Sequence, residues 1–201
     1  MAKIPDSKKP IFLWVKIPYT LFVCVMVVVY LLDYGPSNLL WFSDIGLLMA
    51  VPALWLESAR LSSMIAVGTL FLESLWTVDF LVRLVSGVNL VGLSYYMFEP
   101  DKSLFLRGLS LFHVIMPVLA VWLIYRLGYD RRALIAQTIL CWIVLLFCYF
   151  FTDPAKNINL VFGFGEKFPL QGRVYFLALM AFDPLVIYLP THLALKKIFG
   201  R

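Results

Sequence analysis

Six long apolar runs dominate this 201-residue sequence and limit what it can fold into. They cover residues 11–32, 39–56, 64–85, 104–125, 133–151 and 174–195. A helix rises about 1.5 Å per residue and the hydrocarbon core of a bilayer is about 30 Å thick, so runs of this length predict membrane spans. The runs show no polar/apolar alternation with a period of two, which argues against a β-barrel. We therefore predict a single all-α domain, an integral membrane bundle of six transmembrane helices.

Composition supports this fold class. The chain is 62% hydrophobic and only 14% charged, whereas soluble domains are about half apolar and about one quarter charged. The first run is followed by DYGPSN rather than by a small-residue cleavage site, so we expect a retained helix and not a signal peptide.

Basic residues are divided unequally between the two ends of the predicted bundle. One end has Lys3, Lys8, Lys9, Lys16, Arg60, Arg126, Arg131, Arg132, Lys196, Lys197 and Arg201. The other has only Arg83, Lys102, Arg107, Lys156, Lys167 and Arg173. The positive-inside rule then predicts a multipass protein of the inner (plasma) membrane with both termini in the cytoplasm. Membrane lipids are the expected partners, because basic loop ends meet anionic headgroups. No nucleic acid is needed to explain the charge, and a homo-oligomer is compatible with the sequence.

Two longer connections, 86–103 and 152–173, fall on the predicted outer side. Tyr95, Tyr96 and Phe98 suit an aromatic belt at the headgroup layer. In the second connection, the apolar stretch 160–164 suggests an interfacial or re-entrant segment over the mouth of the bundle.

Six ionisable side chains fall inside the predicted spans: Asp44, Glu73, Asp79, Arg83, His113 and Asp183. Each costs at least ~2.5 kcal/mol at a helix centre, so such groups are rare and usually functional. Counting about 1.5 Å per residue from the predicted outer ends gives depths of roughly 8 Å for Asp44, 9 Å for Asp79, 14 Å for His113 and Asp183, and 18 Å for Glu73. We predict that they form a polar site that opens outward.

The run 64–85 places Glu73 on one helical face with Thr69, Trp76, Thr77 and Phe80. Asp79 and Arg83 are four residues apart and are expected to pair, which would give Asp79 a structural role.

Prolines follow two of these polar residues. Pro117 has no N–H group, so the carbonyl of His113 loses its helical partner and becomes an available acceptor. In the same way Pro184 frees the carbonyl of Met180, one turn from Asp183.

His113 has two interpretations. A neutral ring that bonds to a neighbouring helix would only hold the bundle together. Alternatively, a carboxylate from Glu73 or Asp183 would orient the ring for proton transfer or for ligand binding. A metal site is not predicted, because the Glu-x-x-His repeat of diiron bundles is absent, and no cofactor is expected.

Nearly the whole chain resembles a group of uncharacterised bacterial multipass proteins described as membrane-associated. The resemblance lies in DYGPSNLLWFSDIGLLMAVPALWLE, FLRGLSLFHVIMPVLAVWLIYRLGYDRR, NINLVFGFGE and LVIYLPTHLALKK. It implies a shared topology and no activity.

LFHVIMPV also resembles a segment of the androgen-induced family of six-helix membrane lipid hydrolases, in which a histidine of the fourth helix likewise precedes a proline. WFSD departs from that family, because it has a serine instead of the threonine. That resemblance implies a catalytic site with His113 as base and Ser43 in place of the family's threonine nucleophile. In such a site we expect Asp183 or Asp44 to orient His113. Ser43 is predicted to lie roughly 6 Å deep and His113 roughly 14 Å deep. Direct contact needs about 3 Å, so either the predicted helix ends or this dyad is wrong.

Three functions remain open at this point. The site could hydrolyse lipid or acyl substrates. It could instead belong to a transporter or proton-coupled binding protein in which Asp44, Glu73 and Asp79 hold a cation or polar solute. The buried charges could also be interhelical pairs of a structural membrane protein.

Overall fold

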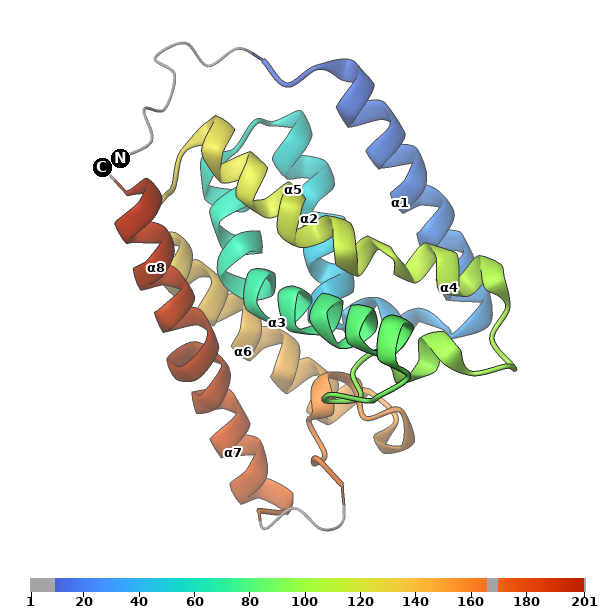
Figure 1. Cartoon of the computed structure of the whole chain (residues 1–201). Helices are drawn as coiled ribbons and strands as arrows, with labels where there is room; N and C mark the ends of the chain where they lie inside the picture. Colours follow the sequence, from blue (N-terminus) through green and yellow to red (C-terminus); the bar gives the residue numbers. More distant parts are fainter. Residues whose placement is uncertain (1–9, 166–169, 201) are drawn as a thin grey trace.

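The computed structural model describes residues 10–165 and 170–200, and within these ranges the chain folds into helices without any strand (Figure 1). Five helical segments are long and apolar enough to cross a membrane. They are α1 (Leu13–Asp33), α3 (Ala59–Ser86), α4 (Leu104–Ser110) with α5 (Phe112–Leu127), α6 (Ala133–Phe151), and α7 (Gly172–Phe182) continued by η5 (Asp183–Tyr188) and α8 (Leu189–Phe199). The predicted helical bundle is confirmed at this level.

The second predicted span is shorter than the others. Helix α2 covers only Phe42–Trp55, 14 residues, and the 3₁₀ helix η1 (Pro36–Leu40) precedes it. At about 1.5 Å per residue α2 is about 21 Å long, less than the thickness of the hydrocarbon core. The side chain of Asn159 explains where α2 begins: its Oδ1 accepts the N–H of Phe42 at 3.0 Å, and its Nδ2 donates to the carbonyl of Leu40 at 2.8 Å.

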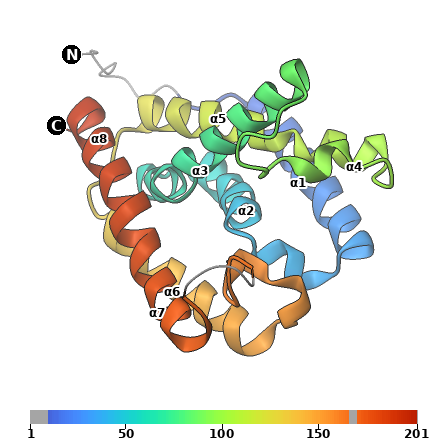
Figure 2. The same cartoon turned by 60° about the horizontal axis from the view of Figure 1, so that its bottom comes forward.

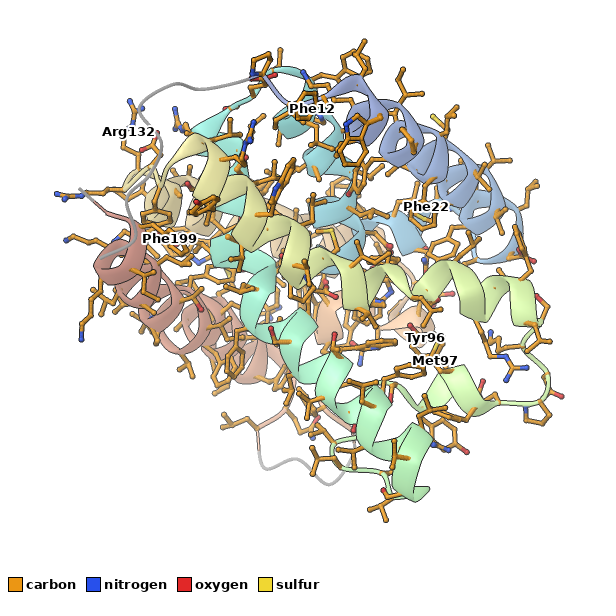
Figure 3. All side chains as sticks on the ribbon, turned by 45° about the horizontal axis from the view of Figure 1, so that its top comes forward. Phe12, Phe22, Tyr96, Met97, Arg132 and Phe199 are labelled. Atoms are coloured by element: carbon orange, nitrogen blue, oxygen red, sulfur yellow. The ribbon has the colours of Figure 1, made fainter. Side chains whose placement is uncertain are left out.

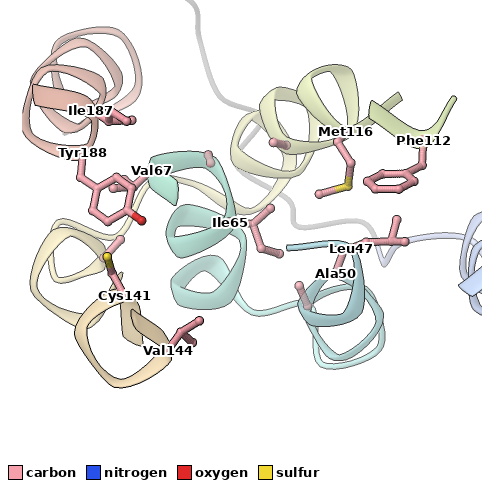
Figure 4. Packing of buried hydrophobic residues seen from close by; sticks show 14 of the residues in the cluster. Leu47, Ala50, Ile65, Val67, Phe112, Met116, Cys141, Val144, Ile187 and Tyr188 are labelled. Carbon is pink, nitrogen blue, oxygen red and sulfur yellow. The ribbon is translucent and has the colours of Figure 1, made fainter. Parts of the chain in front are cut away.

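Helix α3 is the central element of the bundle. It packs against α2 and α5 on one side and against α6, α8 and η5 on the other. Figure 4 shows Ile65 and Val67 of α3 between Met116 of α5 and Tyr188 of η5. This position matters for the site, because polar residues on opposite sides of α3 cannot meet.

The outer surface of the spanning helices is apolar. Leu32, Val85 and Phe151 are 82%, 86% and 74% exposed. Large apolar side chains exposed along whole helices are typical of a surface that contacts lipid. The start of α1 and the end of α8 lie at the same end of the bundle in Figure 1.

Both prolines free a carbonyl, as predicted from the sequence, and each freed carbonyl has found a donor. Thr77 Oγ1 donates to the carbonyl of His113 at 3.2 Å, and Trp142 Nε1 donates to that of Met180 at 2.9 Å. At Pro184 the helix also widens into the π-helical turn η5. A proline ring clashes with the carbonyl four residues before it, and a π turn relieves that clash.

The connection between α6 and α7 folds onto the protein. Its 3₁₀ turns η3 (Pro154–Lys156) and η4 (Ile158–Leu160) lie beside η1 at the beginning of α2 (Figure 2). Ile158 and Val161 are buried in the main core. This segment therefore covers one end of α2 with protein rather than with lipid.

Candidate functional site

Glu73 of α3 and His113 of α5 form a buried pair. The distance from His113 Nδ1 to Glu73 Oε2 is 2.6 Å, and the side chains are 13% and 5% exposed. Of the two carboxylates that the sequence suggested as partners of His113, Glu73 makes the contact. A carboxylate on Nδ1 fixes the imidazole ring and leaves Nε2 as its free nitrogen. Within the described ranges no group hydrogen-bonds to that second nitrogen.

Two aromatic rings hold the imidazole in place. The ring of Trp76 stacks on it with centroids 4.4 Å apart and planes inclined at 23°. Phe112 stacks on it as well, at 4.1 Å and 27°. Together with the hydrogen bond from Thr77 to its carbonyl, these contacts give His113 one defined orientation.

Asp44 lies in the first turn of α2 and is only 3% exposed. Its carboxylate interacts electrostatically with Glu73. Asn38 Nδ2 lies 3.4 Å from Oδ2, whereas Oδ1 is buried without a hydrogen-bond partner among the described residues. Asp44 and Glu73 therefore bring two acidic groups to the same part of the bundle, as the sequence suggested.

Ser43 lies at the level of the Glu73–His113 pair. Gly46 of α2 packs so closely that a Cβ atom there would lie 2.6 Å from Thr69 Cγ2 of α3 and 3.4 Å from Met116 Cε of α5. One helical turn from this contact, toward the same end of the bundle, lie Ser43 on α2, Glu73 on α3 and His113 on α5. Ser43 and Gly46 share a helical face, because residues three apart are neighbours on a helix.

The estimated difference in depth between Ser43 and His113 was therefore wrong. It counted depth from residue 39, but residues 39–40 belong to η1, and the α6–α7 connection covers this end of α2. Ser43 is half-buried, and its hydroxyl makes no hydrogen bond within the described part of the chain, to His113 or to any other residue. Its N–H group and that of Asp44 belong to the first turn of α2, where no intrahelical acceptor is available.

A row of hydroxyl groups borders the pair. Tyr30 Oη and Ser110 Oγ are 3.0 Å apart. Tyr96 also forms a side-chain hydrogen bond with Ser110 and interacts electrostatically with Glu73 and Asp44. Figure 3 shows Tyr96 between α3 and α4, turned toward the bundle. Sequence reasoning assigned Tyr96 to an aromatic belt at the membrane surface, and the structure instead places it beside the polar cluster.

Asp79 has a different role. Its Oδ1 accepts the N–H groups of Val91 and Gly92 at 2.7 and 3.0 Å, and its Oδ2 accepts the N–H and the hydroxyl of Ser94 at 2.8 and 2.7 Å. These four bonds fold the connection after α3 back onto the helix.

The predicted pair between Asp79 and Arg83 is wrong. The guanidinium of Arg83 lies over the rings of Tyr95 and Phe98 instead, 4.7 and 4.6 Å from their centroids. Asp79 is therefore an anchor for the loop, and the structure does not bring it to the Glu73–His113 pair.

Asp183 is also separated from the pair. It lies in η5, where Cys141 Sγ of α6 is 3.7 Å from its Oδ2. Helix α3 stands between η5 and α5 (Figure 4). The carboxylate that contacts His113 is thus that of Glu73 and not that of Asp183. Depth along a helix does not predict the direction in which Asp183 points.

The geometry favours proton chemistry at His113. A carboxylate holds one ring nitrogen, the other is free, and a serine lies at the same level on a neighbouring helix. Among the described residues no three His, Cys, Asp or Glu side chains are grouped so that they could hold a metal ion.

These features define a class, that of multipass helical membrane proteins with a buried histidine–carboxylate pair inside the bundle. Comparisons with family models, with curated proteins and with solved structures find no match.

Proposed function

We propose that this protein is an intramembrane serine hydrolase that cleaves acyl esters of lipids. His113 is the general base, Glu73 orients it, and Ser43 is the nucleophile. The observation that carries the proposal is the 2.6 Å contact between Glu73 and Nδ1 of His113, which leaves Nε2 free for a proton from a hydroxyl group.

The reaction would follow the usual order of acyl transfer. His113 Nε2 takes the proton of Ser43 Oγ as the oxygen attacks the ester carbonyl carbon. The imidazolium then gives that proton to the departing alcohol oxygen, and an acyl-serine remains. A water molecule, deprotonated by the same nitrogen, attacks the acyl-serine and releases the carboxylic acid.

The beginning of α2 supplies the third component of such a site. The N–H groups of Ser43 and Asp44 lack intrahelical acceptors and are the nearest backbone donors to the proposed nucleophile. Donors of this kind stabilise the oxyanion that forms when serine attacks a carbonyl. Apolar helices surround the site, so a substrate dissolved in the bilayer has a shorter path to it than a substrate dissolved in water. The resemblance to the androgen-induced hydrolases points to the same substrates.

Hydrolysis of a fluorogenic acyl ester by the purified protein in neutral detergent tests this function. Ser43→Ala and His113→Ala should each lower the rate by about 10²-fold or more, because general base catalysis contributes about 10² to 10⁴. His192→Ala is the matched control, since His192 is the other histidine of the chain and bonds to Tyr129 instead. Equal rates for the wild type, Ser43→Ala and His113→Ala would refute the proposal.

One observation favours a second candidate, proton-coupled binding of a cation. Asp44 Oδ1 is buried without a hydrogen bond among the described residues, and the carboxylate interacts electrostatically with that of Glu73. Two neighbouring carboxylates attract a cation or a proton. Under this function Asp44→Asn would abolish pH-dependent cation uptake into proteoliposomes. Under the hydrolase function the wild type would show no such uptake.

A further inference from the structure

A cavity opens at the beginning of α2, where the end of α1 and η1 meet the turns η3 and η4 of the α6–α7 connection. Its volume is about 290 Å³, and its walls are Tyr34, Asn38, Trp41, Lys156 and Ile158. This is close to the lower end of the range for small-molecule pockets, about 300 to 1,000 Å³. A cavity of this size suits a headgroup rather than a whole lipid.

Two walls of the cavity are neighbours of candidate active-site residues. Trp41 is the N-cap of α2, two residues before Ser43. Asn38, another wall residue, lies with its amide 3.4 Å from Asp44. A molecule held in the cavity therefore lies near the first turn of α2, the turn that carries Ser43.

Lys156 is the charged residue among those that line the cavity. Lys156 Nζ donates to the carbonyl of Tyr34 at 2.9 Å and to Ser37 Oγ at 3.2 Å. An ammonium group has three donors, so one remains for a ligand. Lys102 Nζ lies 4.8 Å from the centre of the Tyr34 ring and adds a second positive charge nearby. No acidic side chain lines the cavity.

We infer that this cavity binds the phosphate of an anionic glycerophospholipid and so selects the substrate of the proposed hydrolase. Lys156 would donate to a phosphate oxygen, and Tyr34 and Trp41 would contact the glycerol. In such a lipid two carbons of glycerol separate the phosphate from the sn-2 ester, and three separate it from the sn-1 ester. Phosphate in the cavity would thus leave an ester carbonyl near Ser43, two residues from the cavity wall.

Selection of the substrate by this cavity rests on the proposed function, but binding of lipid to the cavity can be measured separately. The full-length protein in neutral detergent is mixed with phosphatidylglycerol or phosphatidylcholine, and retained lipid is counted by native mass spectrometry. The wild type should retain phosphatidylglycerol in preference to phosphatidylcholine. Lys156→Gln should reduce that retention about tenfold, as expected for the loss of one charge-assisted hydrogen bond.

Three further lysine variants serve as controls in this measurement of lipid retention. Lys156→Arg keeps the charge and should keep the lipid, and Lys197→Gln removes a charge from the exposed end of α8 and should change nothing. Lys102→Gln should weaken retention even if Lys156→Gln does not fold, because Lys102 contributes through its charge. Equal retention of the two lipids, or full retention by Lys156→Gln, would overturn the inference. Displacement of the lipid by millimolar inorganic phosphate would show that the cavity takes free phosphate and would overturn it too.

Labelling of Ser43 by a soluble fluorophosphonate separates this inference from the proposed function. Lys156→Gln should be labelled as the wild type is, because the probe has no lipid headgroup. If no variant is labelled while phosphatidylglycerol is still selected through Lys156, the hydrolase proposal fails and the lipid site stands.

Discussion

Glu73 and His113 are 40 residues apart in the chain, and their side chains meet between α3 and α5 with 2.6 Å between Oε2 and Nδ1. The contact depends on how the two helices are held. Thr77 binds the carbonyl that Pro117 frees on His113, and Trp76 stacks on its ring. The catalytic arrangement that we propose is therefore fixed by one face of α3.

The first prediction concerns the tautomer of His113. When the ring is neutral, its proton should reside on Nδ1, because Glu73 accepts from that nitrogen. ¹⁵N spectra of histidine-labelled protein measure this directly, and His192→Asn assigns the only other histidine. Glu73→Gln should weaken the preference, since an amide also donates. A proton on Nε2 in the wild type would contradict the proposed role.

The second prediction concerns the close approach of α2 to α3. Gly46→Ala should destabilise the protein by about 1 to 3 kcal/mol, because the new methyl group would overlap Thr69 Cγ2. The variant should also lose ester hydrolysis, as α2 must shift. Gly108→Ala in α4 is the control, since a Cβ there meets nothing within 4 Å. Adding Thr69→Ser, which removes Cγ2, should restore stability, and an unstable double variant would argue against this explanation. Thermal unfolding in detergent gives the comparison.

The third prediction separates Asp79 from the site. Asp79→Asn turns one acceptor into a donor that faces the N–H or hydroxyl groups of the loop, which should cost about 1 to 3 kcal/mol. Ser94→Ala removes only one donor and should cost less. Both folded variants should keep ester hydrolysis. If Asp79→Asn unfolds at the wild-type temperature but loses activity, then Asp79 belongs to the site after all.

The fourth prediction concerns pH at the other end of α1. Glu57, in the turn after α2, accepts from Lys16 Nζ at 2.8 Å and from the N–H of Ile11 at 2.9 Å. The bond from Lys16, followed by that from Ile11, holds the pKa of Glu57 below its ordinary value of 4.5, although burial opposes this. The folded pKa is therefore lower than the unfolded one. The stabilisation is complete above about pH 4.5 and is lost as the pH falls through the folded pKa.

The unfolding temperature of the wild type should thus fall more between pH 5 and pH 3 than that of Glu57→Gln. The effect should stay below about 1 kcal/mol, because Glu57 is partly exposed. Identical pH profiles for the two proteins would show that this ion pair adds no stability.

Much of the arrangement around Glu73 could be predicted from the sequence. Helical spacing alone puts Thr77 and Trp76 on the face of Glu73, and both contact His113 in the structure. The missing N–H group of Pro117 likewise predicts the free carbonyl that Thr77 uses. These predictions succeed because they depend only on local geometry within one helix.

Other features depend on how helices turn about their axes and on how loops fold, and apolar periodicity carries little information on either. Asp183, which the sequence predicts beside His113, instead faces Cys141 across α3 from it. The hydrogen bonds of Asn159 to η1 and α2 come from a loop residue that is 117 positions away from Phe42 in the chain. The inward position of Tyr96 likewise depends on how the connection after α3 folds back onto the helix.

The most direct test of the central claim is the position of a covalent adduct. Purified protein is treated with a fluorophosphonate, digested, and analysed by peptide mass spectrometry. We predict one adduct on Ser43, about 10²-fold less in His113→Ala, clearly reduced in Glu73→Gln, and unchanged in His192→Ala. An unmodified Ser43, or a Ser43 adduct that persists in His113→Ala, would contradict the account.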